Sequence, residues 1–275
     1  MRPLTPLPGL SGRPRSVAEF RAAGVPRWRL YADDVDHPLH GVVTRRGATS
    51  GADPRVEALR LALGPRQFFS RRTAARLHDI PVRQGKDPGP IEAGALRPLR
   101  PPRRPQVSGH QLREGALRRV PLGPTWLPEV EDAWCLLAQV ASREELLAAA
   151  DYIVSGPSRY EPPLSTLDLL VAASRRFRGC TGAKLCAGVL PLVRTGVESP
   201  RESELRLVIV DAGFAEPVTA CPVRVAGRTL HADLGYPELR IAIEYEGVYH
   251  FGRDAVEQAR RDVARVRAME AAGWR

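Results

Sequence analysis

The last third of the chain carries the pattern that most constrains its fold. Ser199-Pro200-Arg201-Glu202 combines a helix N-cap, a proline at the first helical position and an acid at the third, which predicts a helix that ends at Gly213. Alternating apolar residues then predict three short strands, and a long run rich in arginine predicts a final helix. The predicted strands span 223–225, 230–234 and 241–246, and the predicted last helix spans 254–272.

Three acidic residues fall on the second and third of these strands. Glu244 and Glu246 share one face of the third strand, because side chains alternate along a strand, and Asp233 lies on its neighbour. Like charges so placed repel unless a cation lies between them, and carboxylate oxygens suit a hard divalent ion such as Mg²⁺ or Mn²⁺. The sequence therefore predicts a metal site at these three acids, with His250 near enough to transfer protons.

The run from His231 to Gly247, followed by His250, resembles bacterial endonuclease-like domains of the PD-(D/E)xK superfamily that are related to the very-short-patch repair endonucleases. The resemblance covers about residues 197–275 and continues through Gly273-Trp274-Arg275. It implies a restriction-endonuclease-like αβββα domain that hydrolyses DNA phosphodiester bonds with the help of a bound metal ion.

The same resemblance bears on single positions. It implies that Glu202, an acid in the first helix, lies near the metal, although Glu202 also completes a capping box and needs no further role. Glu246 stands where the closer family usually has aspartate, and His231 stands where it often has arginine. The chain ends at Arg275, where the family continues into another core strand, so the domain is expected to lack its last strand.

The first part of the chain predicts a DNA-binding unit. Ser16-Val17-Ala18-Glu19 is a capping-box pattern that predicts a short helix, followed by a helix over 28–34 and a strand over 39–44. This is the order of a winged helix-turn-helix, whose second helix enters the major groove. In that interpretation Arg27 and Arg29 contact DNA. A small helical hairpin that only packs on its neighbours fits the same pattern.

A weaker resemblance and the charge of the chain point to the same partner. Residues 16–43 and 69–78 resemble the amino-terminal part of proteins with an antitoxin-like winged helix of the AbiEi type, which implies DNA binding by residues 16–45. The chain has 41 Lys and Arg against 31 Asp and Glu. This net charge of +10 favours polyanions as binding partners, although a basic surface that only faces water would give the same net charge. On the predicted last helix, the residues expected along the DNA backbone are Arg260, Arg261 and Arg265.

Other classes of site are disfavoured. The four cysteines form no C-x-x-C pair, so reduced thiols are expected and a zinc ribbon is not. No apolar run approaches the length of a membrane span, so we expect a cytoplasmic protein with no membrane partner. No motif indicates a small organic cofactor.

Together these patterns predict an α+β multidomain chain. The predicted parts are a loose leader at 1–14, a winged-helix or helical DNA-binding-like region at 15–83, an arginine-rich loop or strands followed by a helical region at 84–196, and the endonuclease-like domain at 197–275. The predicted function is that of a metal-dependent DNA endonuclease-like protein. A catalytically inactive DNA-binding regulator of the antitoxin type is the alternative.

Overall fold

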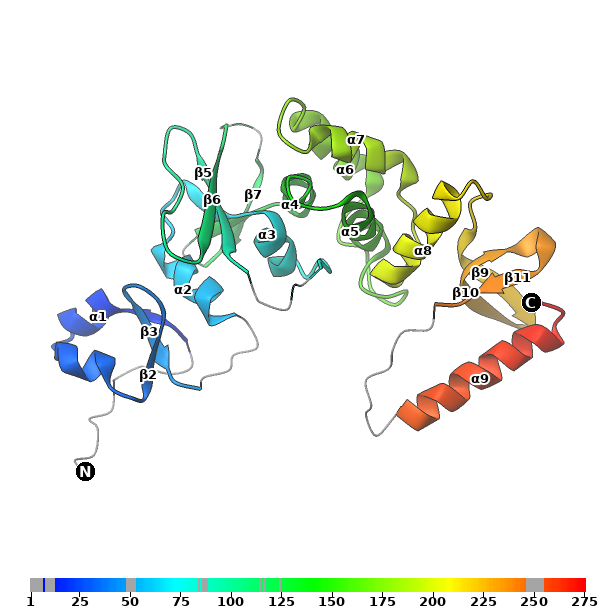
Figure 1. Cartoon of the computed structure of the whole chain (residues 1–275), viewed down its shortest axis with the longest axis horizontal. Coiled ribbons are helices and arrows are strands. Elements are labelled where there is room, and N and C mark those ends of the chain that lie inside the picture. Colours follow the sequence, from blue (N-terminus) through cyan, green and yellow to red (C-terminus); the bar gives the residue numbers. More distant parts are fainter. Residues whose placement is uncertain are drawn as a thin grey trace. The chain divides into compact units, whose positions relative to one another are not determined.

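The computed structural model describes most of the chain as a mixed α/β protein with several small, separate sheets (Figure 1). The described residues are 7, 13–47, 53–83, 85, 89–113, 115, 117–123, 125–245 and 255–275, with the side chains of 255–259, 261 and 262 left out. They group into two compact units, Met1–Ala74 with Gly85–Glu129, and Ala75–Gln84 with Val130–Arg275. No helix in this described part combines the length and the apolar character needed to cross a bilayer.

The amino-terminal part of the first unit is a small sheet with two short helical segments. Its elements are β1 (Arg15–Ser16), α1 (Val17–Ala22), the 3-10 helix η1 (Arg27–Tyr31), β2 (Val35–Leu39) and β3 (Val42–Arg45), with the strands in the order β1-β3-β2. The predicted capping box is present: the Glu19 backbone N–H donates to Ser16 Oγ at 3.1 Å, and the Ser16 N–H donates to Glu19 Oε2 at 3.0 Å. α1 therefore begins where the sequence predicted.

Two predictions for this region are wrong. In place of the helix predicted over 28–34, the structure has the 3-10 turn η1 at Arg27–Tyr31, followed by a bend across which Arg29 pairs with Asp34. The strand predicted over 39–44 is instead a hairpin of β2 and β3. Gly41, with a φ of +81°, reverses the chain in the middle of the apolar run.

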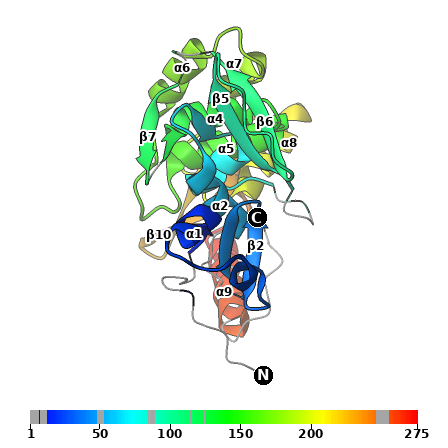
Figure 2. The same ribbon diagram turned by 90° about the vertical axis from the view of Figure 1, so that its left-hand side faces the viewer.

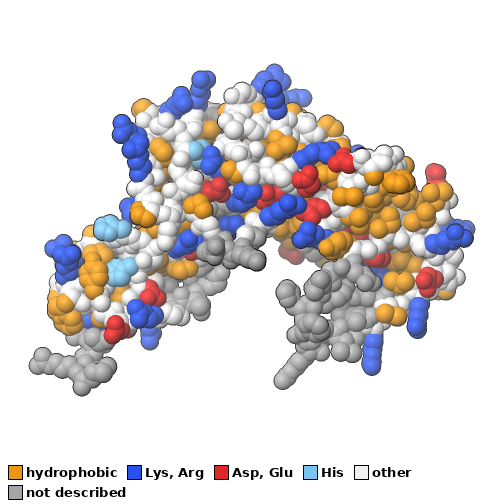
Figure 3. Space-filling view, viewed as in Figure 1, with side chains coloured by type: hydrophobic (Ala, Val, Ile, Leu, Met, Phe, Trp, Pro, Cys, Tyr) orange, Lys and Arg blue, Asp and Glu red, His pale blue; other side chains and the backbone are white. Residues whose placement is uncertain are grey.

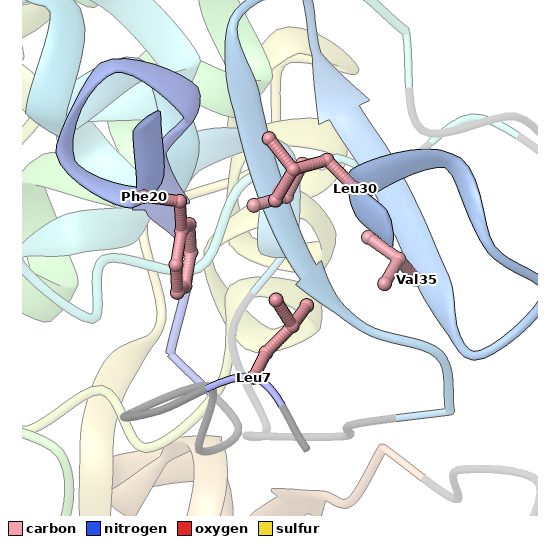
Figure 4. Packing of buried hydrophobic residues seen from close by; sticks show 5 residues of the cluster. Leu7, Phe20, Leu30 and Val35 are labelled. Carbon is pink, nitrogen blue, oxygen red and sulfur yellow. The ribbon is translucent and has the colours of Figure 1, made fainter. Parts of the chain in front are cut away.

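A compact hydrophobic cluster holds this small sheet against α1 and η1 (Figure 4). Its buried members, contributed by different elements and by the segment before β1, are Leu7, Phe20, Leu30, Val35 and Val43. Each large apolar side chain buried in this way stabilises the fold by about 1.5 to 3 kcal/mol before entropy is counted. The cluster fixes which side of η1 faces inward.

The rest of the first unit is built around a three-stranded sheet. Its elements are α2 (Pro54–Ala62), β4 (Gln67–Phe69), α3 (Arg71–Leu77), β5 (Ile91–Leu96), β6 (Val107–Leu112) and the hairpin β7 (Arg119–Leu122) with β8 (Thr125–Pro128). β5 pairs antiparallel with β4 and parallel with β6, and Figure 2 shows β5 and β6 side by side. Gly94 is required in β5, because a Cβ there would lie 2.3 Å from the Phe68 ring.

The second unit begins with a helical layer. Its helices are α4 (Val130–Leu137), α5 (Arg143–Ser155), α6 (Leu167–Arg176), α7 (Ala183–Val189) and the 3-10 turn η2 (Leu190–Leu192). Ser142 caps α5, as its sequence pattern indicates, and Thr166 caps α6. α4 is buried along nearly its whole length, and its two acids, Glu131 and Asp132, accept hydrogen bonds from Ser165 and Arg176 of the neighbouring segment.

The carboxy-terminal part of the second unit runs helix, three strands, helix. Its elements are α8 (Pro200–Asp211), β9 (Val218–Val225), β10 (Arg228–Tyr236), the 3-10 turn η3 (Pro237–Leu239), β11 (Ile241–Ile243) and α9 (Ala255–Ala271). The strands are antiparallel in the order β11-β10-β9, and Met269 of α9 packs into the core that they form. The backbone of Arg275 exchanges hydrogen bonds with Arg240 and Ala242 on β11.

A buried ion pair joins α5 to α8. Arg206 donates to Asp151 Oδ2 at 2.8 Å, and the two side chains are only 1% and 0% exposed. Asp151 also accepts hydrogen bonds from the Ser203 hydroxyl at 2.7 Å and from the Arg194 backbone at 2.8 Å. Arg206 in turn reaches Glu216 at 2.6 Å. Such a pair is compensated only while every member stays in place.

We expect Arg206→Met to lower the free energy of unfolding by about 3 to 5 kcal/mol, because it leaves the Asp151 carboxylate buried without its counter-charge. Chemical denaturation measures the change. Arg143→Met is the matched control, since Arg143 joins the same two helices through Asp211 at 2.6 Å but with side chains 39% and 48% exposed. That variant should cost less than about 1 kcal/mol. Equal losses in the two variants would contradict this account of the helix pair.

Candidate functional site

Two of the predicted acids meet at the open end of the β10–β11 pair. Leu234 lies opposite Ile243 in the antiparallel register, and the next step of the same register places Asp233 opposite Glu244. Asp233 Oδ2 accepts a hydrogen bond from the Tyr245 backbone N–H at 2.8 Å, which ties it to the end of β11. The local cause is the tight η3 turn, which brings the two strands back together within a few residues.

Glu244 carries the most unusual electrostatics of this site. Burial, repulsion by Asp233 and a hydrogen bond with Asp233 raise its pKa to about 7 from its ordinary value of 4.5. The hydrogen bond raises the pKa because only the protonated Glu244 can donate to the Asp233 carboxylate. The two residues thus form a pair that holds a proton near neutral pH, where isolated carboxyls have none.

Glu202 brings a third carboxyl from α8. It is buried, and its Oε2 accepts the Glu198 backbone N–H at 2.9 Å, while its own N–H donates to Ser199 Oγ at 3.3 Å. The predicted N-cap at Ser199 is therefore confirmed, but Glu202 accepts the N–H of Glu198, one residue before the cap, and does not complete the predicted capping box. Burial raises the pKa of Glu202, and the Asp233 carboxylate raises it further, so the two acids lie within electrostatic range of each other.

Arg265 of α9 brings a positive charge to this site. Its Nη2 lies 3.0 Å from Glu244 Oε1, yet among the described residues that buried oxygen has no hydrogen-bond donor. The Arg265 guanidinium donates instead to the backbone carbonyl of His231. Arg265, predicted to lie along a DNA backbone, is therefore turned toward the acids. We call Glu202, Asp233 and Glu244, together with Arg265, the carboxylate cluster.

Four other residues were predicted to act in this domain: Glu246, His250, Arg260 and Arg261. Glu246 and His250 lie outside the described residues, and so does the Arg261 side chain. Arg260 is exposed on α9. Within the described part of the chain, no group of three or more His, Cys, Asp or Glu side chains is arranged to hold a metal ion. Asp233 and Glu244 supply two hard oxygen donors of the kind that Mg²⁺ prefers.

Of the two arginines predicted to contact DNA in the first unit, one is exposed and the other is buried. Arg27 is exposed at the start of η1. Arg29 is buried, and its two terminal nitrogens each donate to an oxygen of Asp34 at 2.7 Å. In this conformation the Arg29 guanidinium supports the turn instead of facing solvent.

Two residues that shape the carboxylate cluster were not singled out from the sequence. Gly235 lets β10 pass close to its neighbours, because a Cβ there would lie 2.7 Å from Cys221 Sγ and 2.8 Å from the Ile241 carbonyl oxygen. Arg159 is held by Glu198 at 2.6 Å, and its charge also interacts with Asp233. Gly235 follows Asp233 by two residues and could be suspected from sequence, whereas Arg159 gives no such signal.

Comparison with known proteins adds little about activity. No family model matches the chain. Two uncharacterized proteins of Mycobacterium tuberculosis, one from strain CDC 1551 and one from strain H37Rv, are each 32% identical to it over 112 residues. The match covers 40% of this chain and 39% of each relative, so only about two fifths of the relatives' length is matched.

The shifted pKa of Glu244 predicts a pH dependence of stability. Because folding raises this pKa from 4.5 to about 7, the stabilisation is fully present below about pH 4.5 and is lost as pH rises through about 7. The loss should be on the order of 2 kcal/mol. Chemical denaturation in a metal-free buffer series across this range measures it.

Glu244→Gln keeps a hydrogen-bond donor but carries no charge, so this part of the pH dependence should disappear. Glu238→Gln, at an exposed acid in η3, is the matched control and should follow the wild type. A Glu244→Gln variant that loses as much stability as the wild type through neutral pH would show that Glu244 is not the titrating group.

Proposed function

We propose that this protein is a metal-dependent, endonuclease-like phosphodiesterase that acts on DNA in the cytoplasm, with Mg²⁺ or Mn²⁺ as its metal ion. The observation that carries the proposal is the pairing of Asp233 with Glu244, which face each other closely enough to share a proton. Two carboxyls so placed are stabilised either by a proton or by a cation between them. A divalent ion would replace the proton and remove the repulsion.

The residues of the carboxylate cluster have distinct roles in this proposal. Asp233 and Glu244 hold the metal ion, and Glu202 or Glu246 completes the set of oxygen donors. The bound metal would polarise the phosphodiester and favour ionisation of a water molecule. Glu244 has a pKa near neutrality, so it exchanges its proton at the pH at which the metal binds. His250 is proposed to assist proton transfer.

The surrounding structure supports the proposal in two ways. The helix–three strands–helix order of α8 to α9 agrees with the restriction-endonuclease-like arrangement inferred from the sequence resemblance. In this proposal the small unit of β1-β3-β2, α1 and η1 would bring the chain to DNA, with the exposed side of the 3-10 turn η1 in place of the recognition helix predicted from sequence. Arg27 and Arg260, both exposed, are the proposed phosphate contacts.

A non-catalytic DNA-binding regulator of the antitoxin type is the second candidate. One observation favours it: Arg265 already places a guanidinium 3.0 Å from Glu244 and supplies a positive charge where the metal ion would act. If that ion pair persisted in the presence of divalent ions, the carboxylate cluster would be a structural feature. The two candidates differ in whether metal displaces Arg265.

A plasmid-nicking assay with Mg²⁺ or Mn²⁺ tests the first candidate. We expect the wild type to convert supercoiled DNA to nicked or linear forms. Asp233→Asn and Glu244→Gln should each slow the conversion by about 100-fold or more, the usual scale for loss of one group that stabilises transition-state charge. Glu238→Gln should cleave at the wild-type rate.

Cleavage that persists in both cluster variants would reject the assignment of the site. DNA binding without cleavage, equal in the wild type and in Asp233→Asn, would favour the regulator. Chelation with EDTA should abolish cleavage and leave binding by the first unit intact.

A further inference from the structure

The outward face of η1 carries two large aromatic side chains in the open. Trp28 is 63% exposed and Tyr31 is 59% exposed, whereas Arg29 and Leu30 between them are buried. Side chains three residues apart eclipse one another in a 3-10 helix, so Trp28 and Tyr31 project from the same side of the turn. Two exposed aromatic rings side by side on one short element make this face of η1 a candidate binding surface.

Neighbouring side chains hold Tyr31 in a fixed orientation. The His37 ring stacks on it with 4.7 Å between ring centroids and 19° between planes, and His37 Nε2 donates to the Leu30 carbonyl at 2.9 Å. The Arg27 guanidinium lies 5.9 Å from the Tyr31 ring. The ring is therefore ordered before any partner arrives, which lowers the entropic cost of binding. We call Arg27, Trp28, Tyr31 and His37 the aromatic platform.

The charged side chains around the aromatic platform indicate which class of molecule it binds. Residues 13–47 contain seven arginines and four acids. Glu19 is engaged in the capping box, Asp34 pairs with Arg29, and Asp36 pairs with Arg46 at 3.0 Å. These two ion pairs also take up two of the seven arginines, so five arginines remain. Figure 3 shows hydrophobic, histidine and arginine side chains together on the surface of this part of the chain. Flat aromatic rings within a basic surface suit a polyanion that has flat apolar faces.

We propose that the aromatic platform binds single-stranded nucleic acid by stacking unpaired bases on Trp28 and Tyr31, with Arg27 paired to the backbone phosphate. Bases within a duplex are already stacked on one another, so only unpaired bases offer both faces to a protein ring. This interaction goes beyond the proposed cleavage and does not involve the carboxylate cluster. Asp233→Asn therefore leaves it unchanged, and failure of one proposal can be told from failure of the other.

The test uses the full chain and three fluorescein-labelled probes of equal length: a single-stranded oligothymidine, a duplex, and an abasic oligomer with the same phosphates. We expect the single strand to bind most tightly and the abasic oligomer much more weakly. Trp28→Ala and Tyr31→Ala should each weaken binding of the single strand by about 5-fold to 150-fold, the range of one lost base stack. Trp28→Phe and Tyr31→Phe should restore most of the affinity.

The matched control is Tyr160→Ala, which removes an 89% exposed aromatic ring from the second unit and should change nothing. Arg27→Gln should reduce the dependence of affinity on salt, whereas Trp28→Ala should not. Because both rings are exposed, melting curves of the alanine variants should match the wild type.

Three results would overturn the proposal. The first is an abasic oligomer that binds as tightly as the oligothymidine. The second is a Trp28→Ala variant that binds the single strand like the wild type. The third is an absence of binding to every probe together with sedimentation showing that Trp28→Ala dissociates a dimer, since the aromatic platform would then contact a second copy of the chain.

Discussion

The buried ion pair between Asp151 and Arg206 is the contact on which the arrangement of the second unit depends. A charge taken out of water is tolerated only with full compensation, and here Asp151 receives hydrogen bonds from a guanidinium, a hydroxyl and a backbone N–H. Arg206 also reaches Glu216, in the segment that leads from α8 into β9. Helix, connecting segment and the first strand of the sheet are therefore held by one network. Glu202 lies one helical turn before Arg206 on α8, so the same network also fixes the position of Glu202.

The carboxylate cluster shows the opposite electrostatic situation. Asp151 faces a guanidinium, a hydroxyl and a backbone N–H, although burial still raises its pKa. Asp233 and Glu244 instead repel each other, and no described residue donates a hydrogen bond to the buried Oε1 of Glu244. A proton or the Arg265 guanidinium relieves that repulsion, and in the proposed function a metal ion would compete with both for the same place. This competition is the physical basis of both the proposed activity and its alternative. Keeping a proton between Asp233 and Glu244 costs little free energy at pH 6 and much more at pH 8. Higher pH therefore favours the guanidinium or a metal ion over the proton.

The two proposals for this chain rest on different kinds of surface. The carboxylate cluster is partly buried, and its three acids and one arginine come from α8, β10, the end of β11 and α9 of the second unit. The aromatic platform is formed by η1 and by His37 of β2 in the first unit, and its rings Trp28 and Tyr31 are exposed. A net charge of +10 is shared across the chain and does not distinguish one site from the other. What distinguishes them is burial, which makes a carboxyl titrate near neutrality in one place and leaves rings open to solvent in the other.

Local sequence determined the features that depend on a few adjacent residues. Ser16, Ser142 and Ser199 cap helices as their patterns indicate, because a cap involves only the first turn. The proximity of Asp233 and Glu244 could also be inferred, since a tight turn between alternating strands fixes the register.

Only the tertiary structure decided the rest. The burial of α4 together with its acids Glu131 and Asp132 depends on partners from later in the chain, and the parallel pairing of β5 with β6 joins strands separated by a connecting segment. Arg29 and Arg265 could not be assigned from sequence, because an arginine side chain is long enough to reach either solvent or a carboxylate. Which of the two it reaches depends on an acid brought near by the fold, Asp34 in one case and Glu244 in the other.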